Sequence, residues 1–175
     1  MRTKVIAPPS RSILVVDDEE AVRVSLTRTL EASGYQVCVA ESADEGLRLL
    51  QRLPVQLVIS DNHMPEMSGI DFLKLVRVRY PHVVRIMLTG DPDPEVPVRS
   101  INEGEVYRFL RKPWNNADLR TILHFAFEVI ALAEENRQLI ALVRKQRHAR
   151  ESGTPLDPMD LEAELLLLAE EEADG

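Results

Sequence analysis

ILVVDDEE (residues 13–20) decides the fold, because four aliphatic residues end abruptly in four acids. A short run with no polar face is typical of a strand buried on both sides, as in a parallel sheet. Further short runs rich in Val, Ile or Leu follow this first one along the chain. They lie at 37–40, 57–59, 85–88 and 106–110.

Helical periodicity fills the gaps between these runs. The expected helices cover 20–33, 43–53, 69–79 and 95–103, and a fifth begins at about Asn116. Gly34, Pro54 and Pro81 end the first three. Prolines at 92, 94 and 97 crowd the entrance of the fourth, which we expect to be short and to start late. The alternation predicts an α/β fold built on a parallel five-stranded sheet.

Composition limits the function classes. The 175 residues carry a net charge of −8 and are 45% hydrophobic, which is enough for a buried core. A single cysteine, Cys38, excludes an intramolecular disulfide and a cysteine-based metal site. Because no apolar stretch resembles a signal peptide or membrane span, we expect a soluble, cytoplasmic protein with no membrane partner.

Polar residues gather where the predicted strands end. Asp17 and Asp18 follow the first, Asp61 the third, Thr89 the fourth and Lys112 the fifth. In an open parallel sheet, ligands bind beyond the carboxyl ends of the strands. Taken singly, these residues are more often helix caps or ordinary surface groups. Together they predict one crevice with three carboxylates, which suits a hard cation such as Mg²⁺.

A metal, an ammonium and a hydroxyl around one carboxylate can stabilise a phosphoryl group during transfer. Asp61 is the expected nucleophile, since it precedes a loop that contains Pro and Gly. Asp17 and Asp18 would hold the metal. Thr89 and Lys112 would contact the new phosphoryl oxygens, and their movement would form a switch.

The motifs resemble the receiver domains of two-component response regulators, the CheY-like superfamily, over about residues 11–130. They are ILVVDDEE (13–20), LVISDNHMPEMSG (57–69), IMLTG (86–90) and FLRKPW (109–114). The resemblance implies a flavodoxin-like, doubly wound (βα)5 sheet of order 2-1-3-4-5, an order already known for this family. It also implies a histidine kinase or phosphotransfer protein as phosphodonor.

The same resemblance assigns roles to individual residues. Asp61 would be the phosphoacceptor, with Asp18 and Asp61 as direct Mg²⁺ ligands, Asp17 as a ligand through water, and His63 as a ligand through its backbone carbonyl. Thr89 and Lys112 would bind the phosphoryl group, and Phe109 would be a switch aromatic. Tyr107, on the same strand face as Phe109, is expected to join the switch and to alter the output surface.

The last predicted helix continues past the sheet as a heptad seam. Its positions are Leu119, Ile122, Ala126, Val129, Ala133, Asn136, Ile140 and Val143, while Leu123, Phe127 and Ile130 supply a second face for the sheet. The seam predicts a parallel coiled-coil homodimer, whose contacts centre on Ile122, Val129, Asn136, Ile140 and Val143. A basic cluster follows at 144–150, and a break at Ser152-Gly153 ends the helix.

Four regions are expected. An N-terminal extension occupies 1–11, the receiver domain 12–130, the extended helix 131–150, and an acidic tail with a short helix 151–175. The tail holds nine acids and no Lys or Arg. This acidic tail is expected to shield the basic cluster at 144–150.

The expected function is that of a phosphoacceptor signalling protein rather than an enzyme, with slow autodephosphorylation and output through changed partner or self association. No helix-turn-helix is recognisable, so direct DNA binding is not expected, and the downstream effector is unknown. One alternative is a dimeric scaffold that ignores phosphate. A less favoured one is a phosphohydrolase that uses Asp61 covalently. RKPW before a long helix is similar to receivers of longer regulators, so the chain could be stand-alone or part of one.

Overall fold

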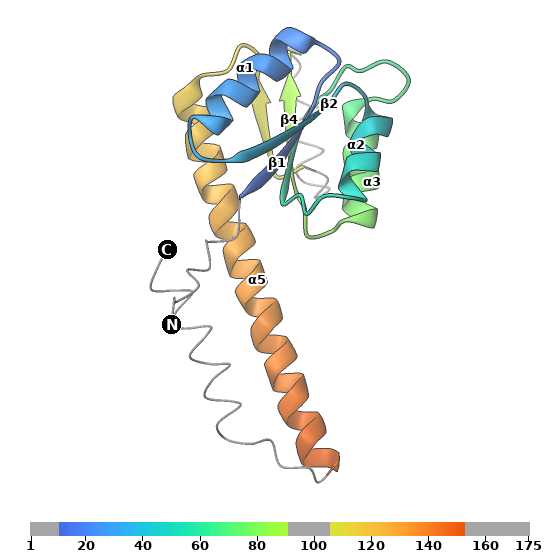
Figure 1. Ribbon diagram of the computed structural model, residues 1–175, viewed down its shortest axis with the longest axis vertical. Helices are drawn as coiled ribbons and strands as arrows, with labels where there is room; N and C mark the ends of the chain where they lie inside the picture. The colour runs from blue at the N-terminus through green and yellow to red at the C-terminus, as the bar shows by residue number, and fades with distance from the viewer. Residues whose placement is uncertain (1–10, 91–105, 153–175) are drawn as a thin grey trace, which may run out of the picture. The chain divides into compact units, whose positions relative to one another are not determined.

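The computed structural model describes residues 11–90 and 106–152 of the chain. Five parallel strands form one sheet in the order β2-β1-β3-β4-β5 (Figure 1). This confirms the expected fold class. The strands are β1 (Ser12–Val16), β2 (Gln36–Ala40), β3 (Leu57–Asp61), β4 (Val84–Thr89) and β5 (Arg108–Arg111).

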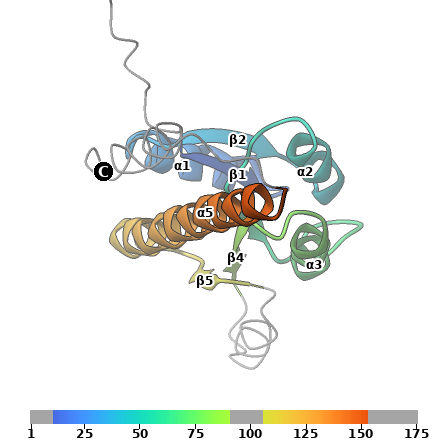
Figure 2. The same ribbon diagram turned by 90° about the horizontal axis from the view of Figure 1, so that it is seen from below.

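Four helices are described in full. They are α1 (Glu20–Glu31), α2 (Ala43–Leu50), α3 (Gly69–Arg79) and α5 (Asn116–Ser152). Figure 2 shows α2 and α3 together on one side of the sheet and α1 on the other, with the first turns of α5. The helix expected at 95–103, the N-terminal extension up to residue 10 and the helix expected in the acidic tail lie outside the described residues.

The core follows from the alternation of side chains along buried strands. Toward α2 and α3, the sheet packs against Phe72 and Val76, both fully buried. Toward α1 and α5, it packs against aliphatic residues of those two helices. The fully buried members on that side include Ile13, Val15, Leu26, Leu30, Leu57, Ile59, Ile86, Leu88, Leu119, Leu123 and Ala126. Both faces of the sheet are therefore covered, as a parallel sheet requires.

Several boundaries differ from the sequence-based expectation. Helix α1 ends at Glu31 rather than at residue 33, because a turn begins there and Gly34 adopts a φ of 86°, which favours glycine. Helix α2 ends at Leu50, three residues short of the expected bound. The strand expected at 106–110 begins only at Arg108, because Arg108 is the first residue that pairs with β4. Val106 is buried in the core but precedes the strand.

The chain divides into two compact units, Met1–Phe127 and Glu128–Gly175. In the first unit, the Phe127 ring stacks on Tyr35 at 5.1 Å between centroids, and the Arg11 guanidinium lies 5.6 Å from the centre of the Phe127 ring. Leu119 and Ala126 are fully buried in this unit. Their placement in an intermolecular seam was therefore wrong, because the sheet of their own domain covers them.

The second unit contains the remainder of α5, as far as Ser152. Val129, Leu132, Leu139, Ile140 and Val143 are all exposed in it. Within residues 11–90 and 106–152, no helix is long and apolar enough to cross a membrane.

Candidate functional site

Asp17 lies directly after β1 and is completely buried. Its backbone is held on both sides: the N–H donates to Ala40 O at 3.2 Å, and the carbonyl accepts from Arg23 Nη1 at 2.6 Å. Its carboxylate Oδ1 accepts from the N–H of Glu19 at 2.9 Å. The second oxygen, Oδ2, is thereby directed toward the end of the sheet, where Lys112 lies.

Asp61 is the last residue of β3, the central strand, and is 5% exposed. Its carboxylate Oδ2 accepts from the N–H of His63 at 2.6 Å. Ser60 Oγ donates to the Asp61 carbonyl at 2.9 Å. These contacts fix the carboxylate at the carboxyl end of the sheet with Oδ1 facing Lys112.

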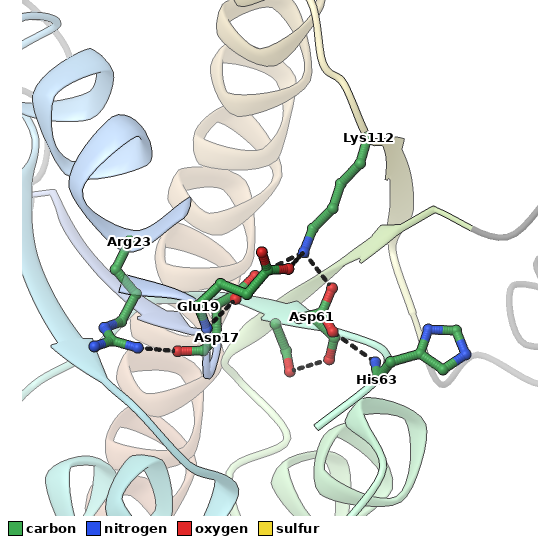
Figure 3. Close-up of polar contacts among 7 residues, drawn as sticks. Asp17, Glu19, Arg23, Asp61, His63 and Lys112 are labelled. Atoms are coloured by element: carbon green, nitrogen blue, oxygen red, sulfur yellow. Dashed lines mark hydrogen bonds and ion pairs between the residues drawn. The ribbon is translucent and has the colours of Figure 1, made fainter. Parts of the chain in front are cut away.

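Lys112, just after β5, joins the two acids. Its Nζ lies 2.9 Å from Asp17 Oδ2 and 2.6 Å from Asp61 Oδ1, and Figure 3 shows the ammonium reaching both carboxylates. A third acid, Glu19, lies 3.7 Å away, but its side chain is 66% exposed. The predicted convergence of Asp17, Asp61 and Lys112 is thus present as one ionic cluster.

Burial and charge act against each other in this cluster. Desolvation raises the pKa of Asp17 above its ordinary value, although the hydrogen bonds from Lys112 and the Glu19 N–H favour the ionised form. Burial alone would lower the pKa of Lys112. The contacts with Asp61 and Asp17 outweigh it and raise that pKa, so the ammonium stays charged at neutral pH.

The loop after Asp61 is held close to the site by a glycine. A Cβ on Gly69 would lie 1.8 Å from the Asp61 carbonyl oxygen, so no other residue fits without displacing the backbone. The Gly69 N–H donates to Asn62 O at 2.9 Å, and Ser68 caps α3 by accepting from the Asp71 N–H. The start of α3 therefore packs directly on the backbone of the acidic residue.

The predicted switch residues occupy the neighbouring strands. Thr89 ends β4, is 7% exposed, and accepts the Lys112 N–H through its backbone carbonyl at 2.8 Å. Phe109 on β5 is partly buried and packs against the core. Tyr107 is also partly buried and precedes β5, and its N–H donates to Arg85 O at 2.7 Å. Thr89 and Lys112 are thus linked through the backbone.

Asp18 follows the buried Asp17 but is itself exposed. Across the described part of the chain, no three His, Cys, Asp or Glu side chains are grouped so as to hold a metal ion. The donor chemistry nevertheless fits Mg²⁺, because Asp17, Asp18 and Asp61 offer only oxygen ligands and carry three negative charges against the single charge of Lys112.

Two charged residues near the cluster were missed by the sequence analysis. Glu19 contacts Lys112 from the N-cap position of α1, and Arg23 binds the Asp17 carbonyl from the first turns of the same helix. Their only signal in the sequence was their place after the acidic pair, where charged residues are common at any helix start.

A doubly wound sheet of this order, with two buried acids and a lysine joined at its carboxyl end, defines a receiver-type α/β domain. The family model for the response regulator receiver domain matches residues 13–124. The chain belongs to this family, as the motifs predicted.

Solved structures agree with this assignment. The signal receiver domain of an HD domain-containing protein from Pseudomonas fluorescens Pf-5 is 39% identical, with a TM-score of 0.67 over 70% of this chain and 98% of that one. A receiver domain protein from Clostridium thermocellum is 34% identical, with a TM-score of 0.65 over 70% and 98%.

Curated relatives are much longer proteins. The hydrogenase transcriptional regulatory protein HoxA of Cupriavidus necator is 42% identical over 59% of this chain and 21% of its own length. The C4-dicarboxylate transport transcriptional regulatory protein DctD of Rhizobium meliloti is 32% identical over 83% of this chain and 30% of its own. The chain thus spans about a fifth to a third of these relatives.

Proposed function

We propose that this receiver domain accepts a phosphoryl group on Asp61 and signals through changed association with a partner or with itself. The observation that carries the proposal is the Lys112 ammonium, which contacts both Asp61 and Asp17. An ammonium group beside a buried carboxylate can also stabilise the negative oxygens of a phosphoryl group bound to that carboxylate.

The acceptor step uses one oxygen of Asp61. That oxygen attacks the phosphorus of the donor, a P–O bond to Asp61 forms, and the bond from phosphorus to the donor breaks with its electron pair leaving on the donor. The His63 N–H, now bound to Asp61 Oδ2, keeps the carboxylate oriented for this attack. The chain is an acceptor in this reaction and not a general catalyst.

Mg²⁺ belongs to this proposal, since receiver domains generally bind it. Asp18 and Asp61, with Asp17 through water and the carbonyl of His63, would hold the ion. When bound, it neutralises negative charge on the phosphoryl oxygens. Lys112 and the Thr89 hydroxyl would bind the remaining oxygens, and Phe109 with Tyr107 would respond to that movement.

Membership of the family implies a cognate histidine kinase as the phosphodonor partner. The output is proposed to be protein association, because no helix-turn-helix is recognisable in the sequence. We retain 12–130 as the phosphoacceptor domain and 131–150 as the segment that mediates self association. A chain that gains no phosphoryl group in the following experiment would instead fit the alternative, a scaffold that associates regardless of phosphate.

The test is intact-mass measurement after incubation with acetyl phosphate and Mg²⁺. The wild type should gain roughly 80 Da, the mass of one phosphoryl group, and Asp61→Asn should gain nothing. Asp71→Asn is a matched control, since Asp71 is an exposed carboxylate at the start of α3. An adduct on Asp61→Asn, or none on the wild type, would overturn the assignment.

A further inference from the structure

Helix α5 carries a second heptad pattern, which the exposed side chains reveal. Val129, Leu132, Asn136, Leu139 and Val143 follow one another at steps of three and four, and every one of them is exposed. In heptad notation, Val129, Asn136 and Val143 are at position a, and Leu132 and Leu139 at position d. The spacing continues backward in the sequence to Phe125 and Ile122.

This pattern, called here the a/d stripe, differs from the seam expected from the sequence. That seam paired the same a residues with Ala133 and Ile140, which fall at position e. The a/d stripe pairs them with leucines on the other side. Leu132 is 59% exposed and Leu139 40% exposed, so two large apolar side chains lie in water unless something covers them.

We propose that the a/d stripe is covered by the same stripe of a second copy of this chain, in a parallel two-stranded coiled coil. The proposal rests on the self association proposed above and specifies its contacts. Val at position a with Leu at position d favours two parallel strands. One Asn at position a is the feature that specifies register and oligomer number in such coils.

The remainder of the helix surface supports this choice. Arg137 forms an ion pair with Glu134, and both lie at positions away from the a/d stripe. Arg144 and Lys145 are also exposed outside it. These charged residues therefore lie away from the a/d stripe, as in a helix with one apolar partner surface.

Asn136 also suits a pairing between identical chains. Its Nδ2 donates to the Leu132 carbonyl at 3.0 Å, within its own helix. The carboxamide oxygen can then accept from the Asn136 amide of the second copy, an arrangement that requires both residues at the same level. Only a parallel, in-register pair places them so.

The test uses single cysteines, which is possible because Cys38 is the one native cysteine. In a full-length Cys38→Ser background, Leu132→Cys, Ala133→Cys and Glu134→Cys are oxidised under mild conditions without any phosphodonor. The first lies on the a/d stripe, the second on the seam first expected, and the third on the outer face. A disulfide between like residues needs Cβ atoms about 4 Å apart.

Leu132→Cys should shift almost entirely to a disulfide-linked dimer, Ala133→Cys less completely, and Glu134→Cys not at all. Val129→Cys and Val143→Cys should both crosslink as well, because parallel chains bring every a residue beside its equivalent. Crosslinking at Ala133 alone would overturn the a/d register. Failure at one end of the stripe would overturn the parallel direction.

Sedimentation of the unmodified wild type completes the test. A dimer at micromolar concentration supports the proposal, whereas a monomer at high concentration overturns it. The same measurement on Asp61→Asn separates the two proposals: a dimer that forms without phosphorylation leaves the a/d stripe valid even if Asp61 accepts no phosphoryl group.

Discussion

Lys112 is the residue on which the candidate site depends, because it compensates two buried carboxylates at once. Without Mg²⁺, Lys112→Met should lower the free energy of unfolding by about 3 kcal/mol, as when one partner of a buried ion pair is removed. Mg²⁺ should stabilise this variant more than the wild type, since a cation can replace the lost charge. Urea denaturation with EDTA or Mg²⁺ measures both effects.

The matched control is Glu19→Gln, which removes only the exposed contact with Lys112 at 3.7 Å. An exposed ion pair contributes at most about 1 kcal/mol, so this variant should unfold nearly like the wild type. Equal stability of Lys112→Met and the wild type in EDTA would show that the ammonium does not stabilise the buried acids.

Asp17 predicts a pH dependence at the same scale. Burial raises its pKa in the folded state, so the folded chain holds this proton more strongly than the unfolded chain. The contribution to stability is present at low pH and is lost as the pH rises, from about pH 4, through the folded pKa. Asp17→Asn should therefore gain stability relative to the wild type as the pH rises in EDTA.

Asp17→Asn also removes the ion pair with Lys112. Because the pKa of Lys112 is raised, its ammonium stays charged throughout this pH range, so the loss of the ion pair changes the free energy of unfolding by an amount that does not vary with pH. The measurement is the difference in free energy of unfolding between Asp17→Asn and the wild type at several pH values. A difference that is flat with pH would contradict the raised pKa.

Single residues were predictable from the sequence where they end a strand. Asp17, Asp61 and Lys112 follow buried apolar runs, and parallel strands bring such ends together. Glu19 and Arg23 were not predictable, because they contact the cluster from helix positions where exposed charges are usual. Asp17 is buried and Asp18 is exposed, and no local sequence pattern predicts which of two adjacent aspartates will be buried.

At the scale of elements, α3 and the end of β3 are joined by a contact that allows no side chain. Gly69→Ala would place a Cβ 1.8 Å from the Asp61 carbonyl oxygen. We expect this substitution to lower the free energy of unfolding by about 1–3 kcal/mol, the usual cost of overpacking. We also expect it to slow the labelling of Asp61 by acetyl phosphate. Thermal melts and intact mass give the two readouts.

Gly90→Ala is the control, since a Cβ there meets no atom of residues 11–90 and 106–152 within 4 Å. Its melting temperature should stay close to that of the wild type. If Gly69→Ala melts like Gly90→Ala and is labelled as fast, the close approach of α3 to Asp61 is unimportant.

Helix α5 shows why the sequence alone did not predict the register of the proposed seam. Steps of three and four can be followed along two adjacent stripes of one helix, and both include Val129 and Asn136. The burial of Leu119 and Ala126 in the receiver removes two members of the first stripe and favours the proposed a/d stripe. That burial depends on packing against distant strands and not on local periodicity.

For the whole molecule, Asn136 predicts how many copies the proposed coiled coil contains. Asn136→Leu should raise the stability of the dimer and permit trimers or shifted registers, because the polar group that restricts pairing is gone. Light scattering and a melt at several concentrations measure both effects, since the melting temperature of an oligomer depends on concentration. An unchanged mass and melt would indicate that Asn136 remains in solvent.

The architecture as a whole was predictable, since five buried runs that alternate with helices allow few arrangements. The sheet order came from resemblance to a family rather than from periodicity, which does not specify which strands are neighbours. The ends of elements moved by one to three residues wherever a turn, such as the one at Gly34, decides the bound.

The ion pair between Lys112 and Asp17 also bears on the order of folding. The two residues are 95 positions apart, and the lysine follows the edge strand β5. During synthesis, the carboxylates emerge long before their counter-ion, and closing so long a loop is slow. The lysine is therefore the last of the three charged groups to be synthesised, so a chain interrupted before β5 would carry both acids without the lysine that holds them.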